Sequence, residues 1–176
     1  MSANQGKKFE QVIKDAFLKV PNVSVDRIPD QVSGFKVTSA NVCDFIVYKK
    51  PHEYYIECKT IHGNTLPFSN IRPNQWEGLL EKSKIEGVVA GVICWWTDKD
   101  VTRFIPIQLL QWMKNDDKKS IRYDCDWLVG IPDEKPFTFK EFHECIDIKG
   151  KKKRVFFDYD MSSFFQTIEE NKKNEV

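Results

Sequence analysis

Asp44, Glu57 and Lys59 are the residues of this sequence whose types and spacing best suit chemistry. Two carboxylates that approach each other repel unless a cation lies between them, and Mg²⁺ is bound by such oxygens together with water. A metal of this kind polarises a phosphate ester and lowers the pKa of a coordinated water, while a nearby lysine neutralises charge on the phosphate. The three residues therefore predict metal-dependent hydrolysis of a phosphodiester, provided that the fold brings them together.

A predicted β-hairpin would bring them together. Residues 44–48 and 53–59 are rich in β-branched and aromatic side chains, and the four residues between them suit a hairpin turn. In that register Asp44 pairs with Glu57, with Cβ atoms about 5 Å apart, and Lys59 shares the face of Glu57. A shift of one residue in the turn would break the arrangement. The competing interpretation is a surface hairpin with a cross-strand ion cluster, although these strands are unusually apolar for one.

The remaining hydrophobic pattern predicts helices packed on a mixed sheet, which is an α/β sandwich. The continuous apolar run 87–96 is typical of a strand covered on both faces. Other predicted strands lie at 23–28 and 101–105, with less distinct ones in 121–131 and 141–157; predicted helices span 5–20, 75–85, 106–113 and 162–170. We expect 60–74 to be loop, and 30–39 to be a loop or a projecting arm.

Length and composition limit the class of protein. The chain of 176 residues suits one domain, and 30% charged with 41% hydrophobic residues is an ordinary globular mixture. Neither an apolar stretch of membrane-spanning length nor a signal peptide is apparent, so we expect a cytoplasmic protein. Five cysteines without a CxxC motif suggest reduced thiols rather than disulfides or zinc. A net charge of +1 neither requires nor excludes nucleic acid.

Several short motifs together resemble the RecU-type Holliday junction resolvases of the PD-(D/E)xK nuclease superfamily. They are an opening GKKFE, the strands CDFIVY and YIECKT, and the loop LPFSNI followed by Gln75. The resemblance covers about residues 4–113. It departs from the family in two places: Cys43 replaces the proline of Pro-Asp, and the segment 27–42 is shorter than the family's projecting stalk.

The resemblance implies a PD-(D/E)xK nuclease-like fold in a single nuclease domain over residues 1–176, with 114–176 as a C-terminal extension. Asp44 and Glu57 would be ligands of Mg²⁺ or Mn²⁺, and Lys59 would be the catalytic lysine. Glu10 would reach the site from the first helix, and Gln75 would lie near the scissile phosphate. The alternative for Glu10 is an ordinary exposed acid, and for Gln75 a residue that only bonds locally within its helix.

The implied substrate is branched DNA, a four-way junction nicked symmetrically during recombination or repair by a homodimer. Neither a membrane nor a small-molecule cofactor is expected, and the short arm would suit a phage-encoded version. Basic residues that flank the site in sequence are candidates for DNA contact: Lys7, Lys8, Arg27, Lys36 and Arg72.

Two other functions stay open. One is a different PD-(D/E)xK nuclease, of the restriction or repair type, and the other is a non-catalytic DNA-binding accessory protein of recombination. The basic run 149–154 also has two interpretations, a solvated hairpin turn or a DNA contact.

Overall fold

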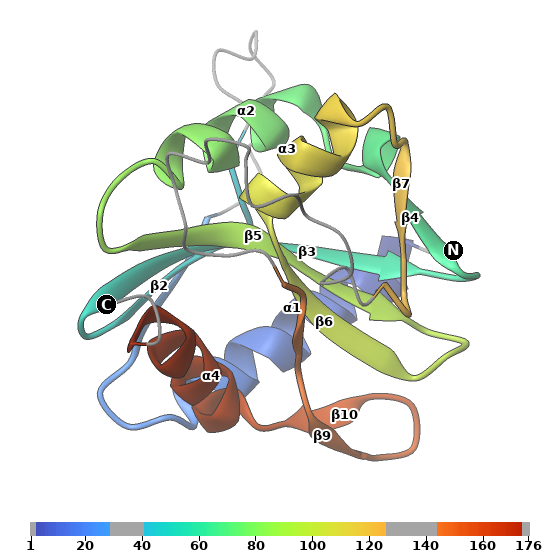
Figure 1. Ribbon diagram of the computed structural model, residues 1–176. Coiled ribbons are helices and arrows are strands. Elements are labelled where there is room, and N and C mark those ends of the chain that lie inside the picture. Colours follow the sequence, from blue (N-terminus) through green and yellow to red (C-terminus); the bar gives the residue numbers. More distant parts are fainter. Residues whose placement is uncertain (1–2, 29–40, 126–143, 174–176) are drawn as a thin grey trace, which may run out of the picture.

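A six-stranded mixed sheet forms the centre of the protein, shown as a computed structural model in Figure 1. The structure describes residues 3–28, 41–125 and 144–173. Along the sheet the strands are β1 (Ser24–Arg27), β2 (Phe45–Lys49), β3 (His52–Ile61), β5 (Val88–Trp96), β6 (Val101–Pro106) and β8 (Ile146–Asp147). Only β3 and β5 pair in parallel, whereas the other neighbours are antiparallel.

Two helices cover each face of the sheet (Figure 1). The helices α1 (Ala3–Leu18) and α4 (Met161–Lys173) pack on one face, and α2 (Pro73–Lys82) and α3 (Ile107–Asn115) pack on the other. The predicted α/β fold, a mixed central sheet flanked by helices, is confirmed. The predicted helices are all present with ends shifted by a few residues, and Pro106 precedes α3 instead of lying in its first turn.

Alternation along the strands creates two hydrophobic cores. On β3, Tyr54 and Ile56 face α1 and α4, whereas Tyr55 and Ile61 face α2 and α3. Every residue of β5 is buried, as expected for a central strand covered on both sides. The core between the sheet and α2 and α3 therefore lies on the face that also receives the odd-numbered side chains Glu57 and Lys59.

The hairpin register matches the prediction. Tyr48 pairs with Glu53 and Phe45 pairs with Ile56, so the next residue outward, Asp44, is aligned with Glu57. Both strands extend one residue further into the turn than predicted, because Lys49 and His52 also pair.

The prediction that 60–74 is entirely loop is wrong. Strand β3 continues to Ile61 because its parallel pairing with β5 continues to Trp96. Strand β4 (Thr65–Pro67) pairs with β7 (Ser120–Arg122), and a 3₁₀ turn over Phe68–Asn70 follows it. These backbone groups are satisfied by partners far away in sequence, which local composition does not reveal.

The C-terminal region contains some of the strands that were expected there. Strand β7 overlaps the start of the predicted region 121–131, and β8 and β9 (Gly150–Lys152) lie within 141–157. Strand β9 pairs with β10 (Phe157–Tyr159) before α4. The possible arm 30–39 and residues 126–143 lie outside the described residues. No helix in the described part of the chain is long and apolar enough to cross a membrane.

Gly91 on β5 tests the close packing of the sheet. A Cβ at this position would lie 2.4 Å from the backbone oxygen of Ile105 and 2.7 Å from the ring of Phe104. We expect Gly91→Ala to lower the free energy of unfolding by about 1–3 kcal/mol, measured by urea denaturation. The matched control is Gly6→Ala in α1, where nothing lies within 4 Å, and it should raise stability by up to about 1 kcal/mol. Equal stability of the two variants would contradict this packing.

Candidate active site

Glu57 and Lys59 form a buried ion pair on β3. The Lys59 Nζ donates to Glu57 Oε1 at 2.6 Å, and the two side chains are 19% and 3% exposed, respectively. Their position two residues apart on a regular strand places both on one face, as predicted, and the structure shows that this is the face toward α2. The pair therefore holds one negative and one positive group in a largely water-free position.

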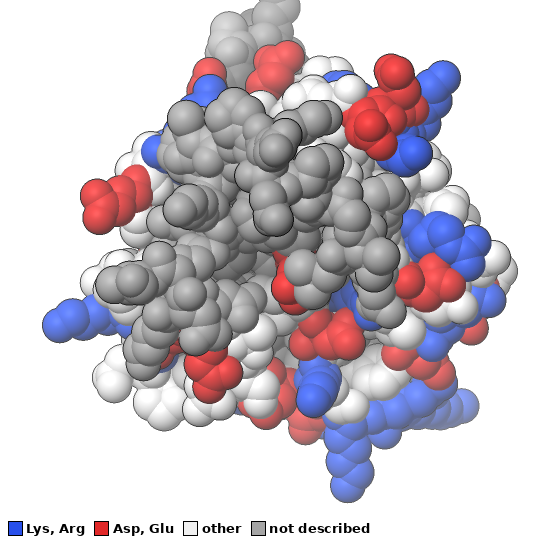
Figure 2. Space-filling model, viewed as in Figure 1, with Lys and Arg blue, Asp and Glu red and all other residues white. Residues whose placement is uncertain are grey.

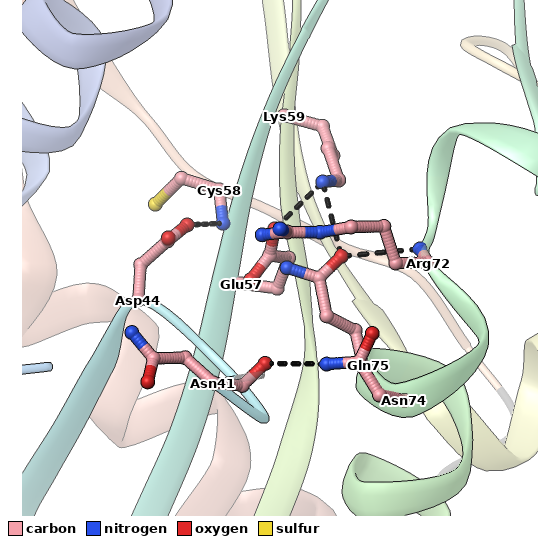
Figure 3. A network of polar contacts seen from close by, with 8 residues as sticks. All are labelled: Asn41, Asp44, Glu57, Cys58, Lys59, Arg72, Asn74 and Gln75. Carbon is pink, nitrogen blue, oxygen red and sulfur yellow. Dashed lines mark hydrogen bonds and ion pairs between the residues drawn. The ribbon is translucent and has the colours of Figure 1, made fainter. Parts of the chain in front are cut away.

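Asp44 lies directly before β2 and turns its carboxylate toward β3. Asp44 Oδ2 accepts a hydrogen bond from the Cys58 N–H at 2.7 Å, and the Asp44 N–H donates to the Ile56 carbonyl at 3.0 Å. Asp44 precedes the first residue of β2, so the Asp44 side chain, rather than a backbone carbonyl of β2, accepts the hydrogen bond from the Cys58 N–H. Figure 3 shows the Asp44 carboxylate beside β3, at the level of Glu57 and Cys58.

The start of α2 supplies the third side of the site. Pro73 occupies the first helical turn, and Gln75 Oε1 accepts from the Arg72 backbone N–H at 3.1 Å. The same oxygen accepts from Lys59 Nζ at 3.4 Å, so Gln75 joins the helix start to the lysine (Figure 3). Asn74 Nδ2 donates to the Asn41 carbonyl at 2.8 Å, which ties α2 to the chain just before Asp44.

Glu10 reaches the edge of the site from α1. Its Oε2 accepts from Arg27 Nη2 at 2.8 Å, and its negative charge contributes to the raised pKa of Asp44. Arg27, a candidate for DNA contact, thus pairs with an acidic residue at the site. Lys7 and Lys8 are exposed on the same helix as Glu10.

Of the other two candidates for DNA contact, the structure describes Arg72 but not Lys36. Arg72 is exposed, and its charge lowers the pKa of Glu57. Figure 3 shows its side chain extending over Gln75 toward Glu57. Lys36 lies outside the described residues.

Two comparisons with known proteins found a match. The sequence matches the family described as RecU, Recombination protein U, over residues 4–128. The chain belongs to the RecU family. This confirms the resemblance found in the sequence and extends it past residue 113.

Among solved structures, the chain is similar to Archaeoglobus fulgidus Hjc, described as a Holliday junction resolvase from an archaeal hyperthermophile. That likeness has 20% identity, a TM-score of 0.45, and covers 59% of this chain and 78% of the other. No curated protein matches the chain.

Burial perturbs both carboxylates of this RecU-family chain, and the charge of Glu57 also perturbs Asp44. Burial, followed by the charge of Glu57, raises the pKa of Asp44 to about 7, although the Cys58 N–H opposes the shift. Burial also raises the pKa of Glu57, against the opposing effects of Lys59 and Arg72. Near neutral pH the isolated pair therefore resists carrying two full negative charges.

An unsatisfied oxygen shows where a cation would fit. Glu57 Oε2 and Gln75 Nε2 are both buried and make no hydrogen bond of normal geometry with the described residues, although the Gln75 side chain is close enough to lower the pKa of Glu57. A buried anionic oxygen without a donor is costly unless a cation takes its place. The oxygen donors of Asp44 and Glu57 suit a hard divalent cation, which keeps other positions for water and phosphate. Within the described segments no cluster of three or more His, Cys, Asp or Glu could hold a metal.

Sequence reasoning missed two features of the site. One is the backbone N–H of Cys58, which holds the Asp44 carboxylate in place. The other is the charge of Arg72 acting on Glu57, because Arg72 had been predicted only to contact DNA. Its position directly before Pro73 was the available signal, since a proline in the first turn places the preceding residue at the helix start.

Asp44→Asn tests the repulsion between the carboxylates. Because folding raises the pKa of Asp44, its contribution to stability is full below about pH 4 and is lost as the pH rises through about 7. Asparagine stays neutral and can still accept from Cys58. In metal-free buffer we expect the variant to be more stable than the wild type by about 1–3 kcal/mol at pH 8, with little difference at pH 4. Urea denaturation at both pH values measures this, and a less stable variant at pH 8 would contradict the interpretation.

Proposed function

We propose that this RecU-family chain is a metal-dependent endonuclease that cuts four-way DNA junctions, with Asp44, Glu57 and Lys59 at its active site. The single observation that supports it most strongly is the buried Glu57–Lys59 pair beside Asp44, whose carboxylate is held at β3 by the Cys58 N–H and has its pKa raised by burial and by the charge of Glu57. A structural ion pair has no need of a second carboxylate so close to it. A phosphodiester nuclease needs both a cation site and a positive side chain next to it.

Asp44 and Glu57 are the proposed ligands of the cation, Mg²⁺ or Mn²⁺. When bound, the cation would polarise the phosphate and lower the pKa of a water molecule. The Cys58 N–H holds the Asp44 carboxylate beside β3, and burial of Glu57 keeps water from competing for its oxygens. Protons compete with the cation for these carboxylates, so cleavage at limiting Mg²⁺ should decline as the pH falls below about 7, where Asp44 of the metal-free site gains a proton.

Lys59 is the proposed group that contacts the reacting phosphate. Its Nζ lies between Glu57 Oε1 and Gln75 Oε1, which leaves one of its three N–H donors for a phosphate oxygen or an attacking water. Gln75 orients this ammonium group, and the α2 helix start holds Gln75 in turn. The lysine thus stabilises negative charge that develops on the phosphate without a large rearrangement.

A homodimer is the assembly that suits this substrate. A four-way junction has near two-fold symmetry, and two matched nicks require two active sites related by that symmetry. One chain supplies one such site, so we propose that two copies act on each junction.

Lys59→Ala and Glu57→Gln test the assignment of the site. Removing one donor to a developing negative charge typically costs about 10²–10³ in rate, and we expect at least this loss of nicking of a synthetic four-way junction in Mg²⁺. Junction binding, measured in Ca²⁺, should stay within a few-fold of the wild type. Lys84→Ala, which removes an exposed lysine from the loop after α2, is the control and should cut normally. Undiminished nicking by Lys59→Ala would refute the site, and equal cutting of linear duplex would indicate another kind of nuclease.

A further inference from the structure

A basic hairpin projects from the molecule next to the edge of the sheet. It consists of β9, β10 and the turn between them (Figure 1). Five of the six residues 149–154 are lysine or arginine, and all six are exposed. Figure 2 shows blue side chains gathered at the lower right, where Figure 1 places this hairpin.

Most of this charge is not compensated within the described part of the chain. Lys152 pairs with Asp100, and Lys153 pairs with Asp158 at 3.3 Å. The three remaining cations have no ion-pair partner among the described residues: Lys149, Lys151 and Arg154. A hairpin turn needs only polar residues to stay in contact with water. Three positive charges on one hairpin, unpaired within the described segments, therefore favour binding to a negatively charged partner.

The base of the hairpin is fixed to the core by aromatic packing. The rings of Phe156 and Phe157 lie 5.4 and 6.4 Å from the ring of Trp95, and Tyr159 shares a 2.8 Å hydrogen bond with Thr102. The Lys153 N–H donates to the Phe156 carbonyl at 2.8 Å and closes the turn. The positive charges are therefore held on a rigid support, which lowers the entropy cost of binding.

The same contacts place the hairpin beside the elements of the active site. Trp95, on which the hairpin packs, pairs with Thr60, the residue directly after Lys59 on β3. Phe9, directly before Glu10 on α1, contacts both Trp95 and Tyr159, at 5.6 and 6.3 Å between ring centroids. The hairpin thus packs on α1, which carries Glu10, and on β5, the strand next to the one that carries Lys59, on the sheet face opposite the Lys59 side chain.

We propose that the β9–β10 hairpin contacts the phosphate backbone of a DNA arm beside the active site. The inference rests on the proposed nuclease function and assigns a role to residues beyond the family match, which ends at residue 128. Lysine and arginine on a rigid hairpin suit sequence-independent contact with phosphates. A membrane fits less well, because Val155 is the one exposed large hydrophobic residue of the hairpin, and interfacial binding needs a larger apolar surface.

The test is a triple variant, Lys149→Ala with Lys151→Ala and Arg154→Ala, none of which touches the active site. We expect the Kd for a labelled four-way junction, measured in Ca²⁺ at 0.1 M salt, to rise at least about tenfold. The slope of log K against log salt should fall by about 2–3, since each lost phosphate contact removes about 0.9. Nicking in Mg²⁺ at saturating enzyme should keep the wild-type rate, because the hairpin binds substrate and does not react with it.

A matched control removes three lysines at the far end of the central strands, Lys49 and Lys50 beside the β2–β3 turn and Lys84 before β5, which should leave the Kd within threefold and the salt slope unchanged. Thermal melts of both triple variants establish that they are folded, and a Lys149→Gln, Lys151→Gln, Arg154→Gln variant must reproduce the loss of junction binding.

A hairpin variant with wild-type junction affinity and wild-type salt slope overturns the inference, while the nuclease assignment stands if the wild type cuts. A wild type that neither binds nor cuts junctions overturns both. Weaker binding to phosphatidylserine vesicles with unchanged junction binding would assign the hairpin to a membrane.

Discussion

The burial of two neighbouring carboxylates beside one buried lysine is the constraint on which the rest of the structure depends. Charges taken out of water are costly unless each finds a partner. Lys59 and Arg72 both act on Glu57, whereas Asp44 has only the Cys58 N–H as a hydrogen-bond donor among the described residues. The pKa of Asp44 is raised to about 7, and burial raises the pKa of Glu57 even though Lys59, Arg72 and Gln75 all oppose the shift. A divalent cation is the natural complement of such a site, and phosphodiester hydrolysis is the chemistry that uses one.

The fold positions these groups from separate elements. The β2–β3 pairing aligns Asp44 with Glu57, the alternation of β3 adds Lys59, and the α2 helix start adds Gln75. The extensive cores on both faces of the sheet offset the cost of the buried charges. This arrangement explains why an apolar hairpin, which would be out of place on a surface, lies in the middle of the sheet.

Local patterns were enough to predict the central part of the site. The turn length and the alternation of the strands determine the register of Asp44 and Glu57, and the continuous apolar run of β5 indicates a strand covered on both faces. The pairings of β4 with β7 and of Arg27 with Glu10 join segments far apart in sequence. No local propensity encodes such partners, so the extent of β3 and the surroundings of Glu10 could be known only from the fold.

Cation binding measured by isothermal titration calorimetry tests the central claim most directly. The account predicts that Mg²⁺ binds to the metal-free wild type at pH 8 and binds much more weakly at pH 6, where Asp44 is largely protonated. Asp44→Asn and Glu57→Gln should each remove the binding, whereas Lys84→Ala should not. Equal Mg²⁺ binding by the wild type and Asp44→Asn would show that the two carboxylates do not form a metal site.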